Sequence, residues 1–206
     1  MLVSIASVEH IQYAHSICET IKQSASVRGT GIAERTPDYV ISKILSGNAV
    51  IALDENQFAG FCYIETWDQA DYVVHSGLIV HPKYRNQGLA FKIKQRIFNL
   101  SKEKYPKAKI FGITTGLPVM KINTALGYKP VTFSKLTADS QFWDGCSTCK
   151  NYQILQEKNR SMCLCTAMLY DPLDTAVSEE RLIKYSVWQR LKRIKGRLLI
   201  KVLLKK

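Results

Sequence analysis

Residues 72–115 restrict the fold of this chain most, because a strand pattern, a polar loop and a helical pattern follow one another there. The apolar run "DYVVHSGLIV" is typical of a strand, and "HPKYRNQGLA" follows it directly. "FKIKQRIFNLSKEKY" then places its apolar residues near one face of a helix of about four turns. "AKIFGITT" is a second strand pattern. Two strands joined by such a helix are expected to lie parallel in one sheet.

The patterns outside this unit predict two further helices and several further strands. Residues 8–24 read as an amphipathic helix. In "TPDYVISKILSG", Thr36 can cap a helix, Pro37 suits its first turn and Gly47 can end it. "NAVIALD" and "FAGFCYIET" read as hairpin strands around the turn "ENQ", and strand-rich sequence is expected again over residues 151–170. These elements indicate an α+β domain.

The formal charge of +12 is concentrated at the C-terminal end of the chain. Residues 181–206 hold ten Lys and Arg and no acid, so the preceding 180 residues carry a formal charge of only +2. This distribution argues against nucleic acid as a partner of the domain. We expect a domain over residues 1–172, followed over residues 173–206 by a basic amphipathic helical tail suited to an anionic membrane surface.

The compartment is inferred from sequence segments that the chain does not contain. It holds neither a signal-peptide pattern nor a run of about 18 apolar residues. The six cysteines are scattered along the chain. We therefore expect a cytoplasmic protein, held peripherally at the inner membrane face by its tail.

The loop after the first strand of the 72–115 unit has the composition of a phosphate cradle. Free N–H groups at a helix N-terminus bind phosphate oxygens readily. Gly88 allows a close approach of the backbone, Ala90 keeps the first helical turn uncrowded, and Arg85 can add charge-assisted hydrogen bonds. The spacing alone is also typical of an ordinary polar turn.

The segment "GLIVHPKYRNQGLA" resembles the acyl-CoA signature of the GNAT acetyltransferase superfamily. The resemblance rests on Arg85-x-x-Gly88-x-Ala90 after a strand that ends in Val80-x-Pro82, and the order of elements extends it over about residues 1–170. It implies a mixed, mostly antiparallel sheet with a central parallel strand pair, flanked by helices. It also implies that loop amides hold the CoA pyrophosphate while the pantetheine arm pairs with the preceding strand. The cofactor residues implied are Ile79, Val80, Arg85, Asn86, Gln87, Gly88, Leu89 and Ala90.

The resemblance also marks the catalytic positions. Many GNAT enzymes carry a tyrosine, four residues before a Gly-Phe pair, that protonates the departing thiolate. Here the pair is Gly127-Tyr128 and the matching residue is Asn123, whose amide can donate a hydrogen bond but cannot act as an acid. Glu65 and His75 are the candidate bases for the amine proton.

Arg28 and Arg35, around the loop between the first two helices, can bind carboxylates and so favour an acidic acceptor. "IFGITTGLPVMKINTALGYKPV", "NYQ" and "CTAMLYD" are similar to N-acetylglutamate synthases. Together with "RGTGIA", they resemble still more a stand-alone bacterial type linked to arginine biosynthesis. This implies transfer of an acetyl or succinyl group from CoA to glutamate, with Thr115 and Lys121 near the acyl site. A polyamine or protein amine as acceptor, a homodimer, and a binding module with little catalysis remain alternatives.

Four cysteines lie in two short motifs near the C-terminal end of the domain. "GCSTCKN" and "RSMCLCTAM" provide Cys146, Cys149, Cys163 and Cys165. If the second pair lies on a strand, its side chains share one face, and four thiolates suit a structural zinc ion. Packing of these cysteines in buried strands is the alternative.

Overall fold

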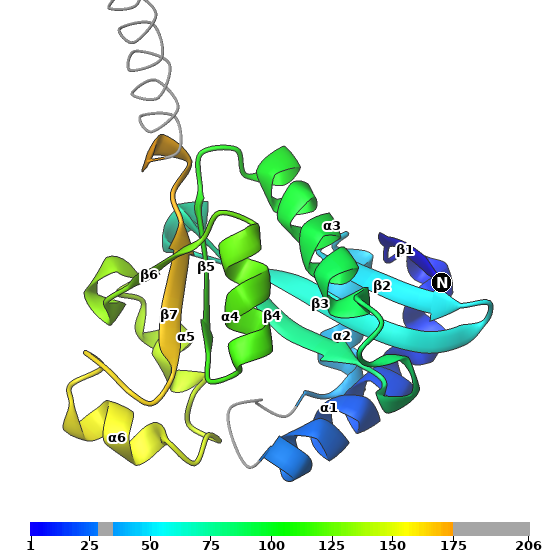
Figure 1. The fold of residues 1–206 in the computed structure, drawn as a ribbon, viewed down its shortest axis with the longest axis horizontal. Helices are drawn as coiled ribbons and strands as arrows, with labels where there is room; N and C mark the ends of the chain where they lie inside the picture. Colours follow the sequence, from blue (N-terminus) through cyan, green and yellow to red (C-terminus); the bar gives the residue numbers. More distant parts are fainter. Residues whose placement is uncertain (29–34, 175–206) are drawn as a thin grey trace, which may run out of the picture. The chain divides into compact units, whose positions relative to one another are not determined.

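The computed structural model describes residues 1–28 and 35–174, of which Met1–Tyr170 form one compact unit. Its centre is a seven-stranded mixed sheet in the order β1-β2-β3-β4-β5-β7-β6 (Figure 1). The strands are β1 (Leu2–Ile5), β2 (Ala49–Asp54), β3 (Gln57–Trp67), β4 (Tyr72–Val80), β5 (Lys109–Thr114), β6 (Lys129–Val131) and β7 (Thr166–Tyr170). The α-helices are α1 (Ala14–Arg28), α2 (Pro37–Leu45), α3 (Leu89–Lys104), α4 (Leu117–Ala125), α5 (Ser140–Asp144) and α6 (Tyr152–Glu157).

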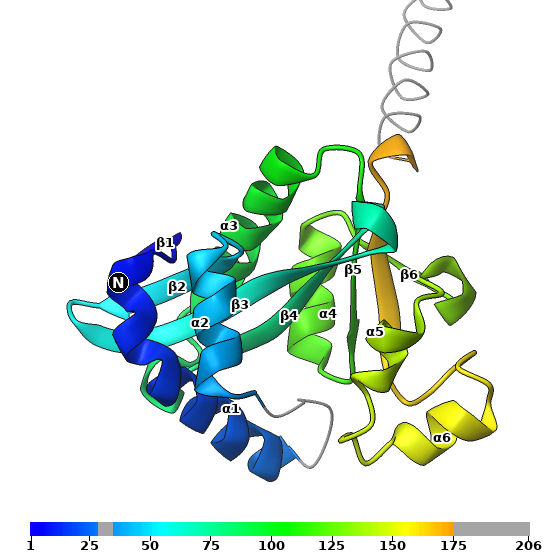
Figure 2. The same cartoon turned by 180° about the vertical axis from the view of Figure 1, so that it is seen from behind.

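Helices cover both faces of the sheet. On one face α3 and α4 cover the strands (Figure 1), and Cys62 and Ile64 of β3 join the apolar cluster that contains α3. On the other face lie α1, α2, α5 and α6 (Figure 2), and Phe61 and Tyr63 pack there with α1 and α2. Alternate residues of β3 therefore enter different cores, as the period of two in a strand requires.

The parallel pair predicted from residues 72–115 is present, but it is short. β4 and β5 pair only at Tyr72↔Lys109, Val73↔Ile110 and Val74↔Phe111, and beyond these positions the two strands diverge (Figure 2). The register between β3 and β4 also shifts between Phe61 and Tyr63. From Ser76 onward β4 is paired with β3 on one side only, so its other backbone edge is open between the diverging strands.

Most of the predicted elements are confirmed, and with them the α+β class and the central parallel pair. Thr36 accepts a hydrogen bond from the amide of Tyr39 at 3.3 Å, and Pro37 begins α2 as predicted. The helix predicted for residues 8–24 is a 3-10 segment, Val8–Tyr13, followed by α1.

The strand-rich prediction for residues 151–170 is only partly correct. Tyr152–Glu157 form α6, and β7 begins at Thr166. Cys163 and Cys165 therefore precede the strand, and the alternation expected to align their side chains does not apply to them.

Among residues 1–28 and 35–174, the structure contains no helix that is both long and apolar enough to cross a bilayer. The predicted tail, residues 173–206, lies outside the described residues except for its first two. Its helical character and its membrane role therefore stay predictions.

Candidate active site

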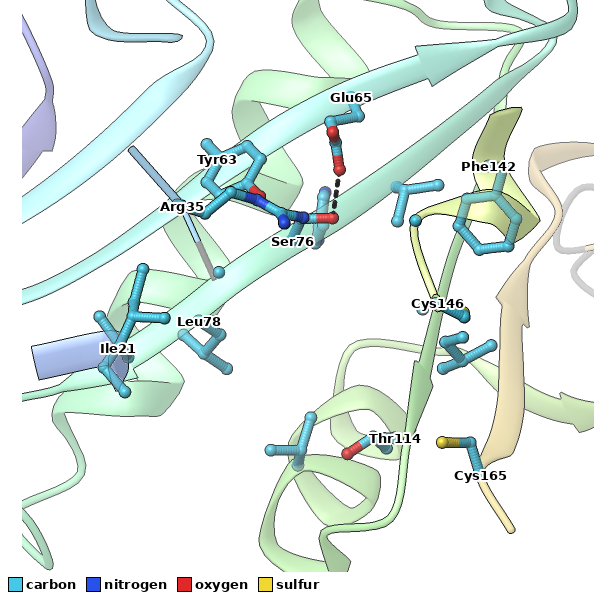
Figure 3. A pocket seen from close by; sticks show the side chains of 18 of the residues that line it. Ile21, Arg35, Tyr63, Glu65, Ser76, Leu78, Thr114, Phe142, Cys146 and Cys165 are labelled. Carbon is cyan, nitrogen blue, oxygen red and sulfur yellow. Dashed lines mark hydrogen bonds between the residues drawn. The ribbon is translucent and has the colours of Figure 1, made fainter. Parts of the chain in front are cut away.

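A cavity of about 660 Å³ lies where β4 and β5 diverge. Residues 76–79 of β4 form one wall and residues 112–116, from β5 and the turn after it, form the opposite wall. Side chains from α1 to α5, from β3 and from the segments after α5 and before β7 complete the lining (Figure 3). The open backbone edge of β4 thus faces a space large enough for the arm of a ligand and a small second molecule.

Glu65 is the only carboxylate among the described residues that line this cavity. Ser76 on β4 donates a hydrogen bond to Glu65 Oε2 at 2.6 Å, drawn in Figure 3, and Tyr39 on α2 donates one to Oε1. These two hydrogen bonds hold the carboxylate of Glu65 in a fixed position on the wall of the cavity. Burial, and then the hydrogen bond to Glu65, raise the pKa of Tyr39, so this tyrosine remains a donor.

Arg35 brings a positive charge to the same part of the cavity. Its Nε donates a hydrogen bond to Tyr63 Oη at 2.6 Å, and its guanidinium carbon lies 5.3 Å from the centre of the Tyr39 ring. Burial raises the pKa of Tyr63 to about 12, so the phenol stays protonated. A cation and an anion are therefore placed side by side on one wall, as Figure 3 shows.

His75, the second candidate base, lies on the α3 side of the sheet. Its Nε2 is 2.9 Å from Ser101 Oγ, and its Nδ1 is 3.1 Å from Tyr128 Oη. Burial, followed by the charge of Lys94, lowers the pKa of His75 well below its usual value of about 6.5. With both ring nitrogens engaged and little tendency to take a proton, His75 suits the role of base less well than Glu65.

Asn123 and Lys94 line the cavity from the α3 and α4 side, and both are almost completely buried. Asn123 Nδ2 lies 3.7 Å from Met168 Sδ, whereas its Oδ1 has no hydrogen-bond partner among the described residues. Asn123 is thus at the cavity, as predicted, while Lys94 was not foreseen.

The loop between β4 and α3 has the shape expected for an anion cradle. Gly88 is the N-cap of α3 with a φ of 74°, and Asn86 also has a positive φ, of 61°. A β carbon added at Gly88 would have no heavy atom within 4 Å, so the space beside it is open. The N–H groups of the first turn of α3, beginning at Leu89, lack acceptors within the helix, which fits the binding of a phosphate group.

The side chain of Arg85 is used within the protein. Its Nε donates to the carbonyl oxygen of Val80 at 3.0 Å, and its Nη2 donates to Ser24 Oγ at 2.9 Å. These bonds tie the loop to the end of β4 and to α1. The expectation that this guanidinium supplies charge-assisted bonds to a phosphate is therefore not supported, and backbone amides are left as the main donors.

The predicted acceptor residues are only partly brought together. Arg35 and Thr115 line the cavity, but Lys121 lies on the exposed face of α4 and does not line it. Arg28 is the last residue of α1, and its side chain lies outside the part of the chain that the structure describes.

The cysteine motifs do not form the predicted zinc site. Cys146, Cys149 and Cys165 line the cavity, but in residues 1–28 and 35–174 no group of three or more His, Cys, Asp or Glu is arranged to hold a metal ion. Burial, and then the nearby cysteines, raise the pKa of Cys146 to about 11 and that of Cys165 to about 12, so the four sulfur atoms lie in one neighbourhood. Because Cys163 and Cys165 are not on a strand, the geometric reason for a four-thiolate site is lost.

Several residues of the cavity gave no specific signal in the sequence. Tyr39, Tyr63 and Ser76 look like ordinary helix and strand residues until the sheet brings them to Glu65. Lys94 likewise looks like an ordinary helix lysine until the fold shows that it is buried at the cavity.

The profile of the acetyltransferase (GNAT) family matches residues 18–116. No curated protein matches the sequence, and the solved structures that resemble it are distant. Rv2747 from Mycobacterium tuberculosis, in complex with CoA, is 12% identical with a TM-score of 0.58, over 83% of this chain and 99% of that one. Diaminobutyrate acetyltransferase from Paenibacillus lautus, in complex with its substrate and CoA, is 10% identical with a TM-score of 0.56, over 83% and 94%.

N-acetylglutamate synthase from Neisseria gonorrhoeae, complexed with CoA and N-acetyl-glutamate, is 13% identical with a TM-score of 0.58. The similarity covers 82% of this chain but only 34% of that larger one. At such identities the solved structures support the fold, while the sequence profile supports the family. Residues 18–116 therefore resemble the acetyltransferase (GNAT) family, and the fold of the chain is the one found in these solved acetyltransferases.

Proposed function

We propose that this protein transfers an acetyl or succinyl group from CoA to the α-amine of a small acidic amino acid, with glutamate as the preferred acceptor. The observation that carries the proposal is that Glu65 and Arg35 both line the cavity, close enough for the charge of Glu65 to act on Arg35. The ammonium group of a bound amino acid would contact the carboxylate of Glu65. The carboxylate of the same amino acid would contact the guanidinium of Arg35. Such an arrangement binds a zwitterion in one orientation.

The charge balance of the cavity favours an acidic side chain on the acceptor. The described lining contains two cationic side chains, Arg35 and Lys94, against one carboxylate, Glu65. A polyamine would add further positive charge beside these two cations, which costs free energy in a partly buried site. The solved N-acetylglutamate synthase complex and the sequence motifs support the same acceptor.

The donor would bind along β4 and the loop that follows it. The CoA pyrophosphate would lie on the amides at the start of α3 beside Gly88, and the pantetheine arm would pair with the open edge of β4 near Ile79. This route delivers the thioester to the cavity. Glu65, directly or through a water molecule, would accept the amine proton as nitrogen attacks the thioester carbonyl.

The experiment that tests the proposal measures release of free CoA thiol by the purified protein. The panel pairs acetyl-CoA and succinyl-CoA with glutamate, aspartate, glutamine, 2,4-diaminobutyrate and spermidine. We expect turnover with glutamate, and the faster donor identifies the acyl group. Turnover with only the cationic amines would overturn the acceptor, and CoA binding without any turnover would favour a binding module.

Two variants separate the roles of the charged pair. Glu65→Gln should lower kcat about 100-fold or more, because it removes the proton acceptor while keeping the shape. Arg35→Gln should instead raise KM for glutamate at least tenfold while kcat changes less. Calorimetry should give wild-type affinity for CoA in both variants. A loss of CoA binding in either one would mean that these residues shape the donor site instead.

A further inference from the structure

Lys94 is a buried charge that the proposed function has not used. It lies on the sheet-facing side of α3, is 2% exposed and lines the cavity. Its Nζ is 5.4 Å from the centre of the Tyr128 ring, and no carboxylate oxygen of the described residues lies within 4 Å of it. Burying an ammonium group without an acidic partner is costly, and proteins keep such groups mostly where they act.

Asn123 places a second unsatisfied polar group on the same wall. It is 1% exposed, its Oδ1 has no hydrogen-bond partner in the described part of the chain, and its backbone oxygen accepts from the amide of Tyr128 at 3.1 Å. Lys94 and Asn123 thus both adjoin Tyr128 and border the cavity. Asn123 Oδ1 can accept a hydrogen bond and the ammonium of Lys94 can donate one. A ligand in the cavity could therefore form hydrogen bonds with both groups.

Two of the three charged side chains that line the cavity, Glu65 and Lys94, belong to opposite faces of the sheet. Glu65 is held on the α2 face by Tyr39 and Ser76, whereas Lys94 comes from α3 on the other face. The gap between β4 and β5 joins the two sides. A thioester lying along β4 in this gap would have the carboxylate on its acceptor side and the ammonium on the side of its leaving sulfur.

We propose that Lys94 is the acid that protonates the departing CoA thiolate, in a protein where Asn123 stands at the position of the usual tyrosine. This inference rests on the proposed function. As the amine attacks the carbonyl carbon, Glu65 takes the amine proton and the C–S bond breaks with its electron pair on sulfur. One N–H proton of Lys94 passes to sulfur and gives free CoA thiol. The neutral amine of Lys94 then regains a proton from solvent through the open cavity.

The acidity of Lys94 suits this transfer. Burial lowers the pKa of Lys94 to about 8, with a smaller opposite effect of Cys62. An unperturbed thiol has a pKa of about 8.5, so the proton passes between groups of nearly equal acidity. An ordinary surface lysine would hold its proton too tightly to act as an efficient acid.

The direct test is the acidity of the thiol of bound CoA, which needs no acceptor. Thiolate absorbance is titrated in the complexes of CoA with the full-length wild type, with Lys94→Met, and with Lys102→Met as a control on the exposed side of α3. The ammonium should lower the pKa of the bound thiol by at least one unit in the wild type and the control relative to Lys94→Met. Equal values in all three proteins would overturn the proposal.

The pH dependence of turnover gives a second readout, which a purely structural role of Lys94 would not produce. We expect kcat of the wild type to fall above about pH 8, and kcat of Lys94→Met to be at least tenfold lower and without that fall. The other titratable groups packed against Lys94 are Cys62, His75 and Tyr128. Burial raises the pKa of Cys62 to about 11, raises that of Tyr128 and lowers that of His75, so none of them titrates near pH 8.

The outcomes separate this inference from the proposed function. CoA bound by calorimetry with an unchanged thiol would overturn the role of Lys94 and leave the acyltransferase intact. Failure of the wild type to bind CoA would overturn both. Because Met removes only a buried charge, the melting temperature of Lys94→Met should equal or exceed that of the wild type, and Lys94→Gln provides a second variant if it does not.

Discussion

The chemistry of the cavity depends on the faces of the sheet to which Glu65 of β3 and His75 of β4 direct their side chains. His75 pairs in register with Ile64, one residue before Glu65. Because side chains alternate along a strand, Glu65 meets Tyr39 and Ser76 while His75 turns to the α3 core. The carboxylate therefore lies on the α2 side of the cavity, where we propose that it receives the amine proton, and the imidazole hydrogen-bonds to Ser101 and Tyr128.

The register shift between β3 and β4 lies near Gly77, a position that has no room for a side chain. Its φ is +63°, and an added β carbon would lie 2.4 Å from Cε1 of Tyr63. We expect Gly77→Ala to lower the free energy of unfolding by about 2 kcal/mol through strain and overpacking. A thermal melt should show a fall of about 5 °C.

Gly112→Ala is the matched control for this change, since a β carbon there meets no heavy atom within 4 Å. It should move the melting temperature by less than about 2 °C. Equal shifts in the two variants would show that close packing against Tyr63 does not explain the glycine at position 77.

Among the elements, β4, the loop after it and α3 form the part on which the donor is proposed to bind. The strand offers an open edge because β5 leaves it after three paired positions, and the helix offers unpaired amides. Arg85 fixes the loop between them by its bonds to Val80 and Ser24. The proposed donor site would therefore be largely preformed, which would limit the ordering cost of binding.

The loop itself can be tested by Gly88→Val. The φ of +74° disfavours any residue with a β carbon, and the new side chain would enter the open space beside the first turn of α3. We expect the Kd for acetyl-CoA to rise at least tenfold in calorimetry. Gly47→Val is the control, because Gly47 has a similar φ of +63° at the distant end of α2. If both variants bind acetyl-CoA as the wild type does, the loop does not hold it.

The elements with strong local signals could be predicted from the sequence, and those without them could not. Thr36 and Pro37 marked the start of α2, and alternation marked β2 to β4. The helix α6 has six residues, too few for a period of 3.6 to be read. The strand β1 is a short edge strand beside a chain end, without a turn signal before it.

The candidate site was predictable only where a single segment carries it. The loop with Gly88 is contiguous, so its composition was enough to predict a phosphate-binding role, which stays a prediction. The contacts of Arg35 with Tyr63, and of Glu65 with Tyr39, join residues 26 to 28 positions apart and depend on tertiary packing. Lys94 was missed for a related reason: a lysine in a helix is normally solvated, and only the fold shows that this one is buried.

For the whole molecule, the buried imidazole of His75 makes stability depend on pH. Its folded pKa lies well below 6.5 because of burial, so below about pH 6.5 the unfolded chain binds a proton that the folded chain does not. Stability should therefore fall as the pH falls from 6.5 toward 5, by up to about 1.4 kcal/mol per pH unit. Urea unfolding of His75→Gln should show a shallower pH slope, whereas replacing the exposed His15 by Gln should leave the slope as in the wild type.

The uneven charge of the whole chain leads to a prediction about membranes. Residues 181–206 carry ten basic residues, while the rest of the chain is close to neutral. Each Lys or Arg near an anionic surface contributes about 1 kcal/mol to binding. We therefore expect the full-length protein to bind vesicles containing phosphatidylserine and to dissociate at high salt. In one variant, Gln replaces four basic residues of the tail, Lys192, Arg193, Lys195 and Arg197. We expect its binding to the vesicles to be at least tenfold weaker and its turnover to be unchanged.

A second variant with the same loss of charge tests whether the position of the charge matters. In this second variant, Gln replaces four exposed lysines of the domain: Lys22, Lys107, Lys129 and Lys150. Sedimentation with the vesicles should find this variant bound nearly as tightly as the wild type, because its tail is intact. Equal weakening of the two variants would mean that net charge alone draws the protein to the surface, and a loss of turnover in the first would place residues 192–197 in the active assembly.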